Sequence, residues 1–188
     1  MTFWYNHVNM YFNVKGSRVK FKVGDMAVYP AHGVGVIEGI EERISGGEKC
    51  DFFVLRILEN SMKITIPAQN LRDVGLRPLI GKKDVDKVYD LFKKPAKTPE
   101  AVNWNRRQRE YMERIKSGSP FDVASVMCEL LTMRRDKDLS FGERKLLDTV
   151  RVLLIKEVAL ASGKTEEDVE AEIAGFFVKP KKEAPVHS

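Results

Sequence analysis

Three arginines and a tryptophan lie close together in residues 102–109 and form the segment of this sequence best suited to bind an anion. Arg106, Arg107 and Arg109 fall in the first two turns of a helix predicted to start near Asn103. A cation there opposes the partial positive charge of the helix N-terminus at a cost of about a few tenths of a kcal/mol, so helix stability does not explain three of them. Arginine makes bidentate, charge-assisted contacts with phosphate, which makes phosphate the expected partner.

Trp104 has two interpretations. It shares a helical face with Tyr111 (i+7) and Ile115 (i+11), a pattern more typical of a core residue. Its position beside three arginines and after a proline-bearing linker favours a side chain that stacks on bases or wedges between them. For the arginines, the alternative is an ordinary solvated helix face. Both alternatives stay open on the pattern alone.

No catalytic motif accompanies this segment. The sequence contains no phosphate-binding glycine loop, nucleophile elbow or HExxH motif. Gly33 and Gly35 lack the third glycine and the following helix of a nucleotide-binding loop, so a β-turn or bulge is expected there. Asp148 and Glu157 are expected on the solvated face of a long helix. An enzyme is therefore the least favoured class, and no cofactor is expected.

The cysteines and histidines do not form a metal-binding pattern. Cys50 and Cys128 stand far apart and are expected to be reduced thiols, and the three histidines are scattered. No apolar run reaches the roughly 20 residues of a membrane helix, and residues 1–19 do not follow the signal-peptide pattern. These observations predict a cytoplasmic protein without a bound metal.

The charge of the chain is concentrated in one segment. The 188 residues are 43% hydrophobic and 31% charged, an ordinary globular composition, with a net charge of +5. Residues 21–80 carry seven basic and eight acidic side chains, whereas residues 93–118 carry eight basic and three acidic ones. The second segment alone therefore equals the net excess, and an acidic partner is expected to bind there.

Residues 21–79 show short β-branched stretches separated by turns. The alternation of apolar and polar residues in 62–67 is typical of a half-buried strand, and Pro67 at its end indicates an edge strand, because proline cannot donate to a ladder. Bends or bulges are expected at Gly35 and Gly39. This spacing predicts a small antiparallel barrel or sheet. The expected strands cover residues 26–30, 34–44, 51–58 and 62–67, with a turn at 45–48.

From Asp84 onward the hydrophobic period becomes helical. Three helix starts are predicted, by Ser119 ahead of Pro120, by the capping box from Ser140 to Glu143, and by the similar segment Thr165-Glu-Glu-Asp168. Helices are expected over residues 84–92, 103–116, from 120, 141–160 and 166–177, with a basic linker at 93–101. The prediction is an α+β protein of two domains, a β-barrel at 21–80 and an all-helical domain at 81–178. Residues 1–20 form an extension and 179–188 a basic tail, and the brief connection at 80–82 predicts a semi-rigid pair of domains.

Several motifs together resemble one known family. They are Phe21-Lys-Val-Gly-Asp25, Val28-Tyr-Pro30, His32-Gly33, Pro67-Ala68 and Asn103-Trp104 followed by Arg106-Arg107. The sequence is similar to the CarD/CdnL family of bacterial RNA-polymerase-binding transcription regulators from about Phe21 to Ala174. That stretch includes the segment Leu139-Ser-Phe-Gly-Glu-Arg144. The first motif also occurs in transcription-repair coupling factors, and its combination with the Trp-Arg-Arg segment makes the resemblance specific.

The resemblance implies a Tudor-like barrel that binds the β subunit of RNA polymerase, and a helical domain that reaches the upstream edge of the transcription bubble. There Trp104 would insert in the minor groove of promoter DNA and stabilise the open complex. Arg106, Arg107 and Arg109 correspond to basic positions that face phosphate, so the contact would not be sequence-specific. We expect the protein to act as a monomer.

On the barrel, the resemblance implies a polymerase-binding set of Arg43, Thr65, Ile66 and Pro67. Arg43 matches a polymerase-contacting arginine at the end of the long second strand. Thr65 stands where the family has a second such arginine, so a charge-assisted contact must be replaced or lost here.

Two other functions remain in competition at this stage. The protein could recruit polymerase to another regulator, with the helical domain binding protein instead of DNA; phosphate contacts, in contrast, predict affinity that falls steeply with salt. A barrel that binds RNA is disfavoured by the net charge of −1 over residues 21–80.

Overall fold

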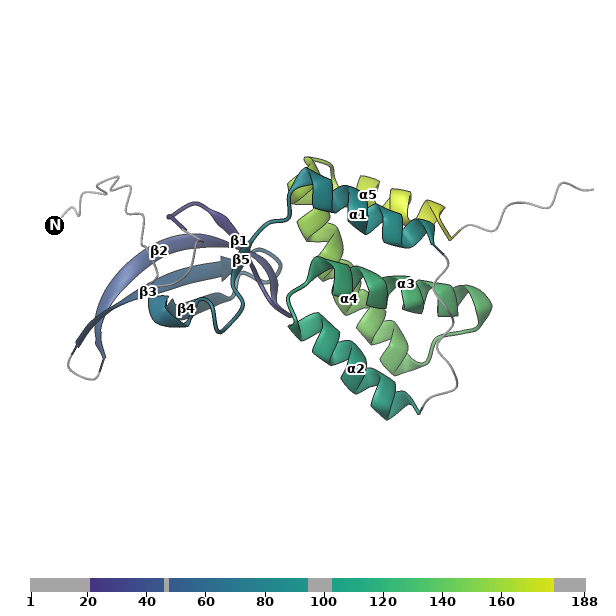
Figure 1. The fold of residues 1–188 in the computed structure, drawn as a ribbon, viewed down its shortest axis with the longest axis horizontal. Coiled ribbons are helices and arrows are strands. Elements are labelled where there is room, and N and C mark those ends of the chain that lie inside the picture. The colour runs from purple at the N-terminus through teal and green to yellow at the C-terminus, as the bar shows by residue number, and fades with distance from the viewer. Residues whose placement is uncertain (1–20, 46–47, 95–102, 178–188) are drawn as a thin grey trace, which may run out of the picture.

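A computed structural model of the chain describes residues 21–45, 48–94 and 103–177. It has a five-stranded antiparallel sheet followed by five helices, which confirms the expected two-part α+β fold (Figure 1). The expected N-terminal extension, the turn at 46–47, most of the linker at 93–101 and the tail lie outside the described residues. We call residues 21–80 the β region and residues 81–177 the helical region.

The β region is one curved sheet with strand order β4-β3-β2-β1-β5. Nine of its buried side chains form a core separate from that of the helices. β4 lies at an edge, as Pro67 predicted, whereas β5 is only two residues long and has no pattern that could have predicted it. The strands are β1 (Met26–Tyr29), β2 (Gly33–Ser45), β3 (Glu48–Ile57), β4 (Lys63–Pro67) and β5 (Arg77–Pro78), with a 3-10 turn η1 (Ala68–Asn70) after β4.

Strands β2 and β3 form a long hairpin that extends beyond the rest of the sheet (Figure 1). The expected irregularity at Gly39 is confirmed, because the register shifts between Ile37 and Gly39. At Gly35 the reason for glycine is space: a Cβ there would lie 2.8 Å from the Arg56 carbonyl oxygen. The bend re-aims the outer half of the hairpin, which carries Arg43.

The helical region begins its elements where the capping residues predicted. Ser119, Ser140 and Thr165 each accept a hydrogen bond from a backbone N–H in the first turn of the helix that follows. Three bounds differ by two residues from expectation, since α1 starts earlier, α4 ends later and α5 ends earlier. The helices are α1 (Lys82–Lys93), α2 (Trp104–Lys116), α3 (Pro120–Asp136), α4 (Phe141–Ser162) and α5 (Glu166–Gly175).

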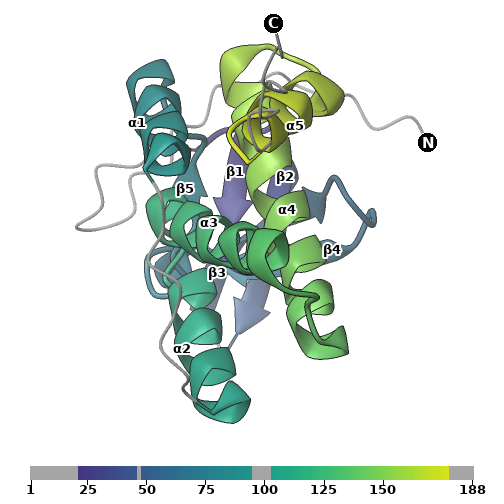
Figure 2. The same cartoon turned by 90° about the vertical axis from the view of Figure 1, so that its right-hand side faces the viewer.

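Helices α3 and α4 form the centre of the helical region, with α1, α2 and α5 packed around them (Figure 2). α4 also packs against β2, so this helix belongs to both the bundle and its contact with the sheet. Asp148 on α4 is exposed as expected, but the expectation for Glu157 was wrong: this carboxylate is buried against the β region. In the part of the chain that the structure describes, no helix has the length and apolarity needed to cross a bilayer.

Candidate nucleic-acid and polymerase interfaces

Helix α2 places Trp104 at its first position. The Asn103 side chain accepts a hydrogen bond from the Asn105 backbone N–H (3.0 Å), which starts the helix at this point. Tyr111 and Ile115, on the same face, are fully buried against α3 and its neighbours. Trp104 is itself half-buried at the rim of that core, so part of its ring is covered and part faces solvent.

The covered side of the Trp104 ring lies on the backbone of Gly142, in the first turn of α4. A Cβ at Gly142 would lie 2.8 Å from Cζ2 and 3.1 Å from Cε2 of the tryptophan. No side chain fits between the ring and this helix without displacing one of them. Gly142 therefore forms part of the surface that contacts the Trp104 ring, a role that only the packing of α2 against α4 reveals.

Arg107 also contacts Trp104, and its side chain does not face solvent. Its guanidinium carbon lies 5.5 Å from the centre of the indole ring, and its side chain is only 11% exposed. It forms an ion pair with Glu143, the residue that closes the capping box of α4. The expectation that Arg107 faces phosphate does not fit this position, because its charge is already paired inside the protein.

Glu143 is buried and remains a carboxylate. Burial alone would raise its pKa, but the hydrogen bonds from Ser140 and the charge of Arg107 outweigh burial and hold the pKa below its ordinary value. The Ser140 backbone N–H donates to Oε2 over 2.8 Å. One carboxylate thus caps α4 and anchors the arginine beside Trp104.

The exposed cations near the start of α2 are Arg106 and Arg109. Arg106 makes a solvent-exposed ion pair with Glu110 (3.0 Å), a contact of small energetic value that a phosphate could replace. Arg109 is exposed on the same helix. Both side chains are exposed to solvent, and their contact with phosphate stays a prediction.

A second aromatic residue, Phe141, was missed by the sequence reasoning. It is the first residue of α4, adjacent to the glycine under Trp104, and it is 77% exposed. Arg144 and Lys145 in the same helical turn are also exposed. The only signal in the sequence was an apolar residue directly after a cap serine, which looks the same whether the side chain is buried or exposed. The starts of α2 and α4 together therefore present aromatic and cationic side chains to solvent.

Three of the four candidate polymerase-binding residues share one face of the sheet. Thr65 pairs with Val54 across β3 and β4, and Pro67 pairs with Phe52. The guanidinium carbon of Arg43, on β2, lies 5.4 Å from the centre of the Phe52 ring. Arg43 and Thr65 are exposed, while Pro67 is half-buried, so the structure brings them together on the solvent face.

The fourth, Ile66, points the opposite way and is 2% exposed in the core of the β region. Its side chain cannot contact a partner, so only the backbone of β4 can contribute there. The Ile57 N–H donates to the Met62 carbonyl oxygen (2.9 Å), and the alternation of an antiparallel pair then turns the backbone polar groups of Lys63 and Thr65 outward. Edge strand β4 thus offers hydrogen-bonding groups to a further strand.

Comparisons with known proteins agree with both halves of the structure. Residues 21–80 match the family model described as CarD-like/TRCF RID domain, and residues 87–174 match the model of the CarD C-terminal domain. YdeB of Bacillus subtilis is 30% identical over 151 residues, which cover 80% of this chain and 98% of YdeB. The solved structure of CdnLNt from Myxococcus xanthus is 48% identical and covers 35% of this chain and 93% of that one, with a TM-score of 0.30.

The two family matches lie in series along this chain and together cover most of it, and the similarity to YdeB extends over nearly the whole length of YdeB. The family is a class of transcription factors and not of enzymes. The chain therefore belongs to the CarD/CdnL family of transcription regulators that interact with RNA polymerase.

Proposed function

We propose that this protein binds the β subunit of RNA polymerase through edge strand β4 and stabilises the open promoter complex by contacting DNA at the upstream edge of the transcription bubble. The observation that carries the DNA contact is the surface formed by the starts of α2 and α4. There the outer edge of Trp104 and the exposed Phe141 lie among solvent-exposed cations. Aromatic side chains flanked by cations suit unstacked bases and neighbouring phosphates.

In this proposal each residue has a distinct role. Trp104 wedges against the bases at the bubble edge, and Arg106 and Arg109 contact phosphates. Arg107, paired with Glu143, holds the tryptophan and does not touch DNA. A few phosphate contacts and one wedge carry no base-specific hydrogen bonds, so promoter preference would arise from the ease of unstacking at the bubble edge.

The polymerase contact is proposed for β4 because this strand is a sheet edge with outward backbone groups beside Arg43. A strand of the partner would extend the sheet, and Arg43 would supply a charge-assisted contact. The net charge of −1 over residues 21–80 favours a protein partner over a nucleic acid for this region.

The test is the lifetime of an open promoter complex after competitor challenge, with and without the protein. The wild-type protein should lengthen it. With Trp104→Ala the increase in lifetime should be roughly tenfold smaller, because stacking on a base contributes about 1–3 kcal/mol. Polymerase binding should stay intact. Trp4→Ala, at the other tryptophan of the chain, is the matched control and should retain full activity.

An unchanged lifetime with wild-type protein bound to polymerase would contradict the proposal and favour a recruiting scaffold instead. Full activity of Trp104→Ala would contradict the proposed wedge role of Trp104 but not the proposed polymerase contact.

A further inference from the structure

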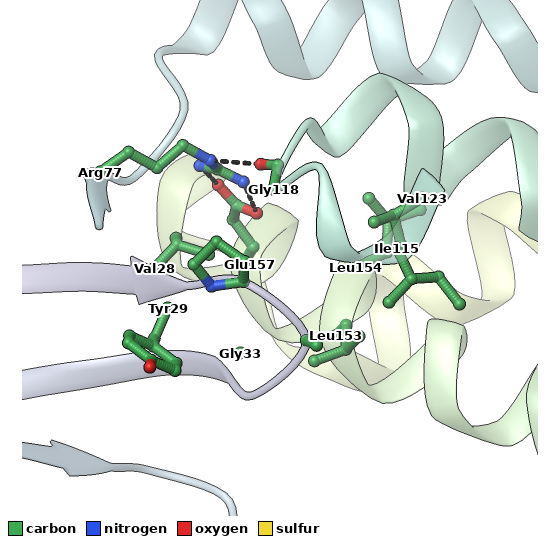
Figure 3. Close-up of a pocket in the computed structure, with 12 residues that line it drawn as sticks. Val28, Tyr29, Gly33, Arg77, Ile115, Gly118, Val123, Leu153, Leu154 and Glu157 are labelled. Carbon is green, nitrogen blue, oxygen red and sulfur yellow. Dashed lines mark hydrogen bonds and ion pairs between the residues drawn. The ribbon is translucent and has the colours of Figure 1, made fainter. Parts of the chain in front are cut away.

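One buried ion pair joins the β region to the helical region. Arg77, the first residue of β5, points its guanidinium at Glu157 in the C-terminal half of α4 (Figure 3). Two nitrogens face the two carboxylate oxygens, with 2.9 Å between Nη2 and Oε2. The Glu157 side chain is only 4% exposed, so the carboxylate has left water to make this contact.

The same pair gathers two further segments. The Arg77 Nε donates to the Gly118 carbonyl oxygen (2.6 Å), in the turn between α2 and α3. The Ile80 backbone N–H, in the connection between the two regions, donates to Glu157 Oε1 (3.3 Å). One guanidinium–carboxylate pair therefore ties the sheet edge, the connection, α4 and the end of the helix that carries Trp104.

The apolar contact around this ion pair is close, but it does not by itself fix the relative orientation of the two regions. A Cβ at Gly118 (φ +74°) would lie 2.9 Å from Cγ of Pro30, and one at Gly33 (φ +92°) would lie 3.2 Å from Cδ2 of Leu153. Apolar contacts of this kind exclude water, but hydrophobic burial is non-directional and does not by itself favour one relative orientation. A second ion pair across the contact, between Lys156 and Glu59, is partly exposed and 3.7 Å long, and so constrains orientation less.

Stability alone is a poor explanation for the Arg77–Glu157 pair. Replacing a buried ion pair by apolar residues of similar volume is often neutral or stabilising, because desolvation offsets the attraction. What apolar residues cannot supply is a two-pronged contact of fixed geometry.

We propose that Arg77 and Glu157 are positioning residues that set the orientation of the helical region on the β region. Resting on the function proposed above, this orientation fixes where Trp104 lies relative to strand β4. β4 and α2 belong to different halves of the molecule, so a rotation about the connection moves the tryptophan relative to a docked polymerase (Figure 1).

The orientation is measured on the full-length protein by residual dipolar couplings of backbone amides. In the wild type one alignment tensor fits both regions. In Arg77→Met/Glu157→Leu each region keeps its own internal couplings but needs its own tensor. The matched control is Arg151→Met/Glu170→Leu, which removes an exposed ion pair between α4 and α5 within the helical region. If one alignment tensor still fitted both regions of Arg77→Met/Glu157→Leu, with the wild-type orientation, the proposal would be overturned.

The functional consequence is tested with the same variants in the open-complex assay. Arg77→Met/Glu157→Leu should bind polymerase with unchanged affinity, but the open-complex lifetime should be roughly threefold or more shorter than with the wild type. This size is typical of coupling between distant sites. The control pair should keep it. If the wild-type protein itself leaves the lifetime unchanged, the proposed function fails. The alignment tensors would still show whether the ion pair sets the orientation of the two regions. Full lifetime in a variant with two tensors would overturn the link between orientation and activity.

Discussion

At the scale of single residues, Trp104 owes its position to two neighbours that sequence periodicity does not reveal. The absence of a side chain at Gly142 lets the ring approach the helix backbone, and Arg107 lies near the ring while remaining paired with Glu143. The ring is thus pre-positioned at the protein surface before any ligand is bound. A pre-positioned aromatic loses less conformational entropy when it binds than a freely rotating one.

Gly142→Ala should displace Trp104. In an ordinary helix this change would add up to about 1 kcal/mol of stability. Here the new Cβ lies 2.8 Å from the ring, so we expect a net loss of about 1 kcal/mol from overpacking. The tryptophan emission, recorded in a Trp4→Phe background, should shift to longer wavelength as the ring becomes more exposed.

The matched control is Gly175→Ala at the end of α5, where an added Cβ meets nothing within 4 Å. Its emission should equal that of the background. If Gly142→Ala also left the spectrum unchanged, the tryptophan would not depend on this glycine.

At the scale of elements, the start of α4 combines a cap with an ion pair. The Ser140–Glu143 capping box satisfies backbone groups at the helix start, while the same carboxylate neutralises Arg107 from α2. The beginning of α4 therefore cannot fray without releasing the arginine beside Trp104. Its stability and the geometry of the candidate DNA surface are linked.

This link predicts a dependence on pH. Because the folded-state pKa of Glu143 is lowered, the stabilisation it provides is complete above its unfolded pKa of about 4.3 and is lost as pH falls through the folded value. Glu143→Gln preserves the cap but leaves Arg107 buried without its counter-ion. We expect it to lower the free energy of unfolding at pH 7 by about 3 kcal/mol and to weaken the acid dependence below pH 4.3.

Urea unfolding at pH 7 and pH 3 measures both effects. The comparison is Glu110→Gln, which removes the partner of the exposed Arg106 and should change stability by less than about 0.5 kcal/mol. Equal losses in the two variants would contradict a special role for the buried pair.

At the scale of the whole molecule, the two proposed contacts lie on separate cores. The polymerase-binding candidates stand on the sheet, and the DNA-binding candidates stand on α2 and α4. Each should then be adjustable without changing the other, provided that the ion pair between the regions is intact.

Thr65→Arg tests this separation. Thr65 is exposed on β4 next to the proposed docking edge, and an added guanidinium there could make one charge-assisted contact. We expect polymerase affinity to rise roughly tenfold, with Thr65→Gln as the uncharged control. At saturating protein the open-complex lifetime should equal that of the wild type. A changed lifetime at saturation would mean that the two contacts are coupled.

Much of this organisation was determined by local sequence. Ser119, Ser140 and Thr165 predicted three helix starts, and Pro67 predicted the edge position of β4. Such signals are reliable because a cap bonds to N–H groups two or three residues away and a proline lacks its own donor. The two-part fold followed from the change of hydrophobic period between residues 67 and 85.

Only the tertiary structure decided which charged residues are exposed. Arg107 was expected to face phosphate and Glu157 to lie on a solvated helix face, yet their partners are 36 and 80 residues away in the chain. Phe141 looked as if it could be either buried or exposed. Periodicity defines which residues share a face of a helix but not what covers that face, because the cover comes from elements distant in sequence. That is why the contacts of Trp104 with Gly142 and Arg107, and the ion pair that joins the two regions, could be identified only in the folded chain.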